Sequence, residues 1–342
     1  MQKNYFLKRI LIIQTASLGD VILATPLIEK LHHFYPKARI DFLLKYGYED
    51  LLRGHPFLKA VMVWDKTEHK YRHLIELVKI VRANKYDLVV NVQRYASSGL
   101  ITALSGTKHR VGFSKNPLSL FFSRRVSHRI GKSGDNPHEI ERNLKLIESF
   151  TDETIFKPVL YPSKHDFARV SQYKTRKFIT VSPASLWFTK QFPKEKWSTF
   201  VASVDEDTTI YFLGSNKDKV LCDEIIILSG HTNCLNLAGK LSVLESAALM
   251  KDAVMNYTND SAPLHLASAM NAPVAAIFCS TVPGFGFGPL SEKSYIIQTQ
   301  EQLKCRPCGI HGFKSCPKQH FRCALGIENR QLLEVLEKNE KY

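Results

Sequence analysis

The sequence of 342 residues is long enough for two domains that each bury a hydrophobic core. Hydrophobic residues make up 44% of the chain and charged residues 23%, which is the range of soluble globular proteins. No apolar run approaches the roughly 20 residues that span a bilayer, which excludes a membrane-spanning helix. The apolar run at residues 10–13 is too short for the core of a signal peptide, so we expect a cytoplasmic protein.

The formal net charge of +15 predicts anionic partners, such as nucleic acid, phosphorylated metabolites or an anionic membrane surface. Basic residues are densest between Lys108 and Lys132. The simplest explanation of this basic stretch is a solvated face that keeps the protein in solution. Because no known nucleic-acid-binding pattern accompanies the charge, we expect no nucleic-acid partner.

The first half of the chain alternates short apolar runs with longer amphipathic segments. This pattern predicts parallel strands that are buried on both faces and connected by helices. We expect strands at residues 10–13, 40–44, 60–64 and 88–92. Strands that alternate with helices are typical of a doubly wound α/β fold.

A polar segment with Pro158 and Pro162 interrupts this alternation. We place a domain boundary there, which predicts one domain at residues 1–165 and another at residues 166–342. The alternation then restarts, with strands expected at residues 178–181, 209–213, 253–257 and 274–278. Two such sheets in tandem predict a ligand cleft between the domains.

The loop after the first strand contains Ser17-Leu18-Gly19-Asp20. Gly19 permits a tight turn there. Asp20 either caps the following helix, whose dipole favours an acidic residue, or acts as a general base at the end of the strand. The loop lacks the three-glycine pattern of dinucleotide-binding proteins, which disfavours a nicotinamide-dependent enzyme.

A second polar loop begins at Ser182, where a strand ends, and contains Lys190 just before a helix that starts near Pro193. The helix dipole disfavours a lysine at this place. Lys190 is therefore either merely exposed to solvent or shares a bound phosphate with the helix.

A third polar loop, Asp260-Ser261-Ala262, connects a strand to a helix with Pro263 in its first turn. The backbone N–H groups of Ser261 and Ala262 are expected to point at an anion. Taken alone, Asp260 could be a helix cap and His265 a hydrogen-bonded histidine of the core.

These three loops together resemble the motifs of glycosyltransferase family 9, the ADP-heptose:lipopolysaccharide heptosyltransferases. The matching stretches are residues 17–20 with Thr25-Pro26, residues 189–193 with Trp197, and residues 259–261 with residues 265–267. The resemblance covers nearly the whole chain. It implies a GT-B fold, in which two Rossmann-like, doubly wound parallel-sheet domains face a central cleft. The N-terminal domain would hold mainly the acceptor and the C-terminal domain mainly the nucleotide-sugar.

The resemblance also implies an inverting transfer of heptose, or a related sugar, from an ADP-activated donor to the lipopolysaccharide core or a related surface glycolipid. Asp20 would take the proton from the attacking acceptor hydroxyl, and Lys190 would stabilise the departing diphosphate. A lysine and a helix N-terminus can neutralise a diphosphate, so no metal is expected for catalysis. Further donor-binding residues would be Ser182, Asp260, Ser261, Ala262 and His265, and acceptor-binding residues would be Ser17, Gly19, Arg124 and Arg125.

For such an enzyme, we expect the basic stretch to hold the protein at the inner face of the cytoplasmic membrane, beside a lipid-anchored glycan acceptor. The protein would then be a peripheral membrane protein. The stretch also contains Phe113, Phe121 and Phe122. Phe121 and Phe122 either contribute to this surface or pack in the core.

Ala262 departs from the family pattern, since many members have glycine there. Its methyl group limits how closely a phosphate approaches the backbone. The donor therefore stays open, and one alternative is a GT-B glycosyltransferase that uses another nucleotide-sugar for O-antigen or capsule synthesis. An alternative of another class is a non-catalytic nucleotide-sugar-binding protein, although such a protein has no need of both Asp20 and Lys190.

Four cysteines lie close together near the C-terminus, namely Cys305, Cys308, Cys316 and Cys323. Their spacing is consistent with a structural zinc site, although it is not that of a standard zinc finger. The alternatives are reduced cysteines that pack a loop and, least in keeping with a cytoplasmic protein, disulfides.

Overall fold

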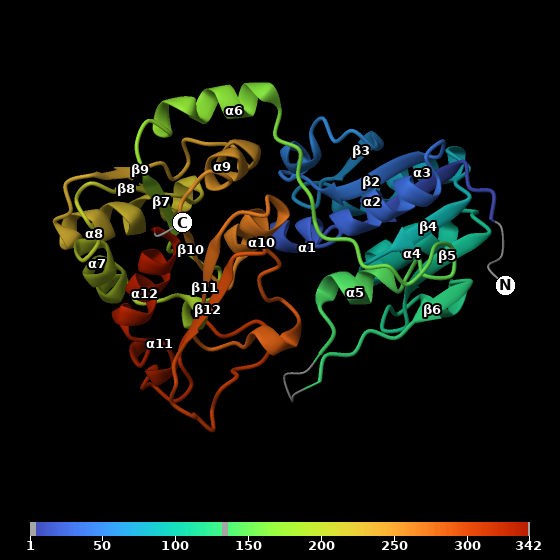
Figure 1. The fold of residues 1–342 in the computed structure, drawn as a ribbon. Coiled ribbons are helices and arrows are strands. Elements are labelled where there is room, and N and C mark those ends of the chain that lie inside the picture. Colours follow the sequence, from blue (N-terminus) through green and yellow to red (C-terminus); the bar gives the residue numbers. More distant parts are fainter. Residues whose placement is uncertain (1–4, 132–135, 341–342) are drawn as a thin grey trace. The chain divides into compact units, whose positions relative to one another are not determined.

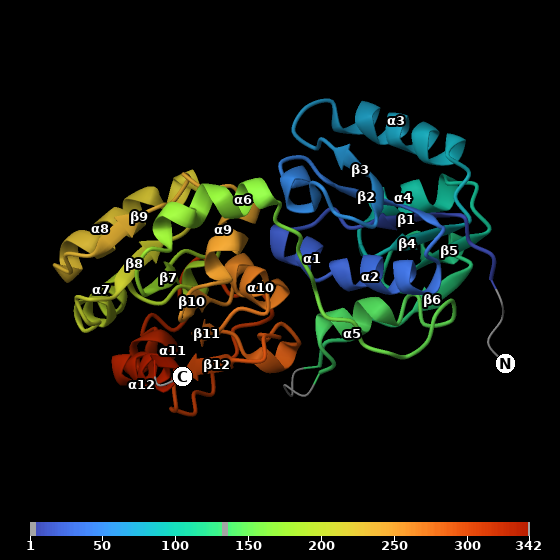
Figure 2. The same cartoon turned by 45° about the horizontal axis from the view of Figure 1, so that its top comes forward.

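The computed structural model of the protein describes residues 5–131 and 136–340 (Figures 1 and 2). The described chain forms two compact units. The N-terminal unit consists of the described residues within Met1–Ile130 and Pro137–Tyr161, and the C-terminal unit of those within Gly131–Asn136 and Pro162–Tyr342. Lys132, the last residue of the basic stretch, lies outside the described ranges. None of the helices in these ranges combines the length and apolar character needed to cross a bilayer.

The described part of the N-terminal unit is built on a six-stranded parallel sheet with the strand order β3-β2-β1-β4-β5-β6. Helices cover both faces of this sheet, with α1, α2 and α5 on one face and α3 and α4 on the other (Figures 1 and 2). The strands are β1 (Arg9–Ile13), β2 (Arg39–Lys45), β3 (Leu58–Trp64), β4 (Leu88–Asn91), β5 (His109–Phe113) and β6 (Arg124–Val126). The helices are α1 (Leu18–Ile22), α2 (Thr25–Phe34), α3 (Lys70–Ala83), α4 (Ala96–Leu104) and α5 (Glu139–Leu144), with short 3₁₀ turns η1 (Glu49–Leu52) and η2 (Ser119–Phe121).

The C-terminal unit repeats this plan in its described residues, with the strand order β12-β11-β10-β7-β8-β9 in a second six-stranded parallel sheet. Helices α7, α8, α11 and α12 cover one face, and α6, α9 and α10 cover the other (Figure 2). The strands are β7 (Phe178–Ser182), β8 (Thr209–Phe212), β9 (Cys234–Asn236), β10 (Asn256–Asn259), β11 (Val274–Phe278) and β12 (Ser294–Gln298). The helices are α6 (Lys164–Val170), α7 (Lys194–Ala202), α8 (Lys219–Ser229), α9 (Val243–Met250), α10 (Ala262–Ala269), α11 (Arg322–Leu325) and α12 (Asn329–Glu340). Four 3₁₀ turns complete the unit, namely η3 (Ser171–Tyr173), η4 (Phe188–Lys190), η5 (Asn216–Asp218) and η6 (Pro283–Phe285).

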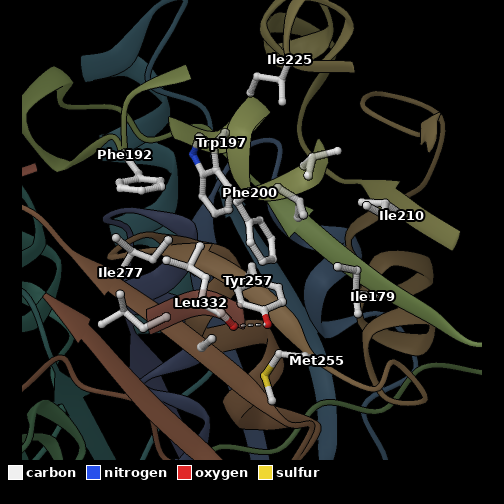
Figure 3. Packing of buried hydrophobic residues seen from close by; sticks show 14 of the residues in the cluster. Ile179, Phe192, Trp197, Phe200, Ile210, Ile225, Met255, Tyr257, Ile277 and Leu332 are labelled. Atoms are coloured by element: carbon white, nitrogen blue, oxygen red, sulfur yellow. Dashed lines mark hydrogen bonds between the residues drawn. The ribbon is translucent and has the colours of Figure 1, made fainter. Parts of the chain in front are cut away.

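The core of the C-terminal unit fixes the strand that leads to Asp260. Trp197 and Phe200 of α7 pack with Tyr257 of β10 in one buried cluster, and the rings of Phe200 and Tyr257 are 4.6 Å apart (Figure 3). The hydroxyl of Tyr257 donates a hydrogen bond of 2.9 Å to the carbonyl of Leu332. Burial of a side chain of this size contributes roughly 1.5–3 kcal/mol to the free energy of unfolding, so Tyr257 anchors β10 in the core.

A buried lysine joins α2 to the segment by which the chain leaves the N-terminal unit. The side chain of Lys30 is 1% exposed, and its Nζ lies 2.9 Å from Oδ1 of Asp152. The same Nζ donates to the carbonyls of Asp152 at 2.7 Å and Thr154 at 2.6 Å. Hydrogen bonds from Lys30 and Thr154 hold the pKa of Asp152 at about 2.

The two doubly wound parallel sheets predicted from the sequence are confirmed, and most expected strands differ from the observed ones by one or two residues at an end. One expectation was wrong, because the strand expected at residues 253–257 is β10, Asn256–Asn259. Its asparagines are buried but hydrogen-bonded, with Asn256 Nδ2 donating to the carbonyl of Met250 at 2.9 Å. An apolar pattern cannot reveal a strand whose buried side chains are polar.

Candidate functional site

Asp20 lies in a capping box at the start of α1, directly after β1. Ser17 is the N-cap, and its backbone N–H and hydroxyl donate to Oδ2 of Asp20 at 3.0 and 2.5 Å. Asp20 returns a backbone hydrogen bond to the Ser17 hydroxyl at 3.4 Å, and Gly19 is buried in the first turn. The carboxylate therefore takes part in capping the helix, which is the first of the two roles considered from the sequence. Its use as a general base remains a prediction.

Lys66 is a basic residue near this loop that the sequence analysis missed. Its Nζ donates to the carbonyl and the hydroxyl of Thr15, at 2.8 and 3.1 Å, and lies 4.5 Å from the centre of the Trp64 ring. Burial lowers its pKa to about 8, and the charges of Lys45 and Lys70 add to this effect. The one signal in the sequence was a lysine two residues after an expected strand.

The basic stretch forms β5 and the edge strand β6, neither of which was predicted. Arg124 and Arg125 are exposed on β6. In the preceding turn η2, Leu120 is 79% and Phe121 is 59% exposed, whereas Phe122 is buried. Phe121 therefore lies on the surface, whereas Phe122 and Phe113 pack in the core.

In the C-terminal unit, Lys190 and Asp260 form an ion pair. The Nζ of Lys190, at the end of η4, lies 2.7 Å from Oδ2 of Asp260, and the two side chains are 14% and 7% exposed. Thr281, which follows β11, donates to the same oxygen at 2.7 Å. Asn259 joins the two loops, because its Oδ1 accepts from the backbone of Phe192 at 3.0 Å. Thr281 belongs to no motif that we recognised in the sequence.

The helix that follows Asp260 begins without a side-chain cap. Ser261 is the N-cap of α10, and its side chain does not bond to the N–H groups of the first turn. Ala262 and Pro263 open the helix, as predicted. A helix N-terminus without a cap carries unsatisfied N–H groups and a partial positive charge, so it favours an anion. His265 is buried on the same helix.

Ser182 completes the set of donor-binding residues expected from the sequence. It ends β7 and lies in register with Thr258 of the neighbouring strand β10. Its hydroxyl is buried and has no hydrogen-bond partner among the residues that the structure describes. Lys190 and Asp260 are therefore brought together beside Ser261 and Ala262, with Ser182 at the end of the neighbouring strand and His265 one turn further along α10.

The expected zinc site is not formed by the described residues, among which no group of three or more His, Cys, Asp or Glu side chains is placed to hold a metal ion. Cys305 Sγ lies 3.7 Å from Nε2 of His320, while Cys308 Sγ donates to the carbonyl of Cys305 at 3.4 Å. Cys323 is buried in α11, and Cys316 lies on a separate turn. All seven cysteines are free thiols, so none of them closes a disulfide, and Cys305, Cys308 and Cys316 lie in the loop between β12 and α11.

Comparison with known proteins places this geometry in a family. Lipopolysaccharide heptosyltransferase 3 of Escherichia coli is 27% identical over 281 residues, which cover 77% of this chain and 81% of that protein. The structure of E. coli ADP-heptose lps heptosyltransferase II is similar with a TM-score of 0.79 and 21% identity, covering 98% of this chain and 100% of that one. A glycosyl transferase family 9 structure from Veillonella parvula gives a TM-score of 0.81 with 19% identity, covering 99% and 98%.

These structural likenesses show that the two units have the GT-B fold. The model of glycosyltransferase family 9 (heptosyltransferase) matches residues 74–311, which is more than half of the chain. The chain therefore belongs to glycosyltransferase family 9, the heptosyltransferase family, and is a glycosyltransferase.

Proposed function

We propose that this glycosyltransferase transfers a heptose from ADP-heptose to the core of lipopolysaccharide, with inversion at the anomeric carbon. ADP-heptose and lipopolysaccharide are the substrates named for its relatives. The observation that supports the donor most directly is the pair of Lys190 and Asp260 beside the uncapped N-terminus of α10. A cation and a helix N-terminus at one place suit a diphosphate.

The proposed reaction is a single displacement. The acceptor hydroxyl oxygen attacks the anomeric carbon of the heptose while Asp20 accepts the hydroxyl proton. The bond between that carbon and the diphosphate oxygen breaks, and ADP leaves with the bonding electrons. Lys190 and the first N–H groups of α10 stabilise the charge that develops on the diphosphate. These protein groups supply the neutralisation, so we propose that transfer needs no metal ion.

We also infer that the protein works at the inner face of the cytoplasmic membrane as a peripheral protein. Arg124 and Arg125 are exposed on an edge strand, and the apolar side chains of Leu120 and Phe121 are exposed three to five residues before them. Each Lys or Arg near an anionic membrane contributes about 1 kcal/mol of attraction, and exposed apolar side chains add to it. A surface of this composition suits an anionic lipid-anchored acceptor.

Initial-rate assays with purified protein test the proposal. Lipopolysaccharide core that lacks the heptose is supplied with ADP-heptose, and with UDP- and GDP-sugars as competitors. We expect transfer from ADP-heptose, with ADP released in equal amount. Transfer from only a UDP- or GDP-sugar would instead favour an enzyme of O-antigen or capsule synthesis, and binding without turnover would favour a non-catalytic protein.

A further inference from the structure

We propose that the cysteine-rich segment, residues 303–323, is a positioning element of the donor site that sets the place of Lys190 and Asp260. The proposal rests on the proposed function only in that Lys190 is taken to bind the donor diphosphate. The segment bonds to the residue next to Lys190 and to the loop that contacts Asp260, and all of these bonds lie within the C-terminal unit.

The first route passes through Thr189, the residue before Lys190. The backbone N–H of Thr189 donates to the carbonyl of Phe313 at 3.1 Å, and the N–H of Phe313 donates to the Thr189 hydroxyl oxygen at 2.7 Å. The hydroxyl of Ser280 also donates to this oxygen, at 3.0 Å. Thr189 is 1% exposed, so these bonds are shielded from water. They fix the turn η4 from which the side chain of Lys190 extends.

The second route passes through Arg306 to the loop after β11. The guanidinium donates to the carbonyls of Phe278, Cys279 and Thr281 at 3.0, 2.8 and 2.9 Å. The backbone N–H of Cys308 donates to the carbonyl of Ser280 at 2.8 Å, so four consecutive carbonyls, from the last residue of β11 into the loop, are bonded to the segment. Thr281 is thereby held where its hydroxyl reaches Asp260 at 2.7 Å. Charged donors make the stronger hydrogen bonds, which suits a positioning role for Arg306.

Gly312 shows how closely the segment approaches the lysine. A Cβ atom at this position would lie 2.7 Å from Oγ1 of Thr189 and 3.1 Å from Cγ of Lys190. Such distances require the neighbouring atoms to shift, so any side chain at residue 312 would push on the Lys190 turn. The bound diphosphate must be met at hydrogen-bond distance, and a displacement of about 1 Å can cost about 10²-fold in rate.

The chain offers a matched control for this contact. Gly309, in the same segment, also has a positive φ, of +71° against +74° for Gly312, so alanine is strained at both positions. A Cβ atom at Gly309 meets nothing within 4 Å. Comparing Gly312→Ala with Gly309→Ala therefore separates the pressure on Lys190 from the backbone strain that both variants share.

The test measures initial rates and donor affinity of both variants and their free energies of unfolding. We expect Gly312→Ala to lower kcat/KM for the nucleotide-sugar by about 10- to 100-fold, with KM for the acceptor unchanged. Gly309→Ala should retain the wild-type value. Equal values for the two variants would overturn the proposal.

A second pair of variants covers the case in which Gly312→Ala does not fold. Thr189→Val removes the hydroxyl oxygen that accepts from Phe313 and Ser280, whereas Thr189→Ser keeps it. We expect the valine variant to lose donor affinity and the serine variant to restore it. Wild-type donor affinity in Thr189→Val would refute the positioning role, whereas no transfer from ADP-heptose by the wild-type protein would refute the proposed function, so the two failures are distinguishable.

Discussion

The Nζ of Lys190 lies 2.7 Å from Oδ2 of Asp260, and Thr281 donates to that same oxygen, so the lysine has an anionic partner within the protein. A diphosphate that binds at Lys190 must then share the cation with Asp260. The ion pair fixes the position of the lysine side chain, and the hydroxyl of Thr281 keeps the carboxylate in place.

Removing the lysine should therefore affect both stability and chemistry. Lys190→Ala leaves the buried Asp260 without its cation, which costs about 3–5 kcal/mol of unfolding free energy in comparable buried pairs. Its kcat should fall by about 10²–10³-fold, as for the loss of one group that stabilises a developing anion. The double variant Lys190→Met/Asp260→Asn removes both charges, and we expect it to regain stability without regaining activity. Recovery of both in urea titrations and rate assays would mean that Lys190 is purely structural.

The wild-type rate should be unchanged after treatment with EDTA, because in the proposed reaction Lys190 and the N-terminus of α10 neutralise the leaving group. A rate that is lost to EDTA and restored by magnesium or manganese would contradict the metal-free reaction.

Asp20→Asn should lower kcat by roughly 10²–10⁴-fold, the usual contribution of a general base, while donor affinity stays close to that of the wild type. The asparagine keeps an oxygen that can accept from Ser17, so the cap of α1 largely survives. The equivalent capping box of α6, Ser163 with Asp166, provides the control. Asp166→Asn alters a cap in the same way and should leave kcat unchanged. If Asp20→Asn kept more than half of the wild-type kcat, Asp20 would serve only to cap the helix.

Lys66 should make stability depend on pH above neutrality. Burial lowers its pKa from 10.5 to about 8, so between these pH values the unfolded chain binds a proton that the folded protein has lost. The unfolding free energy should therefore rise with pH from about 8 to 10.5, and the cost of the buried cation is fully present below pH 8. The unfolding free energy of Lys66→Met should gain most on that of the wild type at pH 7, and this gain should vanish by pH 10.5. Lys59→Met removes an exposed charge as the control, and curves parallel to the wild type for Lys66→Met would rule this account out.

The basic surface should act on the acceptor and not on the donor. Replacing Arg124, Arg125 and Arg129 with serine is expected to raise KM for the glycolipid and to weaken binding to anionic vesicles at low salt. A triple serine variant of Arg72, Lys79 and Arg82 on α3 removes the same charge from the same unit and should bind vesicles more strongly than the first variant. Wild-type vesicle and acceptor binding by the first variant would leave the charge with a solubilising role only, and equal loss in both variants would mean that binding depends on net charge and not on this surface.

The exposed apolar pair can be tested separately. Leu120→Ser/Phe121→Ser leaves the net charge unchanged and should reduce vesicle binding at high salt, where the electrostatic attraction is screened. Phe122→Ser is a different experiment, because that side chain is buried against Gly112 and its loss should lower the unfolding free energy instead.

The sequence contained enough to predict both sheets and the loops with Asp20, Lys190 and Asp260, because strand, polar loop and helix follow one another locally. It did not reveal β6, since Arg124 and Arg125 are exposed at a sheet edge and follow no apolar pattern. Thr281 and Gly312 could not be found either. Their importance comes from contacts with residues that are distant in sequence, and the neighbouring residues do not predict such contacts.

The buried ammonium of Lys30 decides where the N-terminal half can be separated from the rest. Its partners Asp152 and Thr154 lie downstream of Gly131 and Asn136, two residues that belong to the C-terminal unit. A fragment that ends before residue 131 would leave the buried Lys30 of α2 without Asp152 and Thr154, which accept its hydrogen bonds. Any independently expressed N-terminal half must therefore run at least to Thr154, the last of the residues that bond to Lys30.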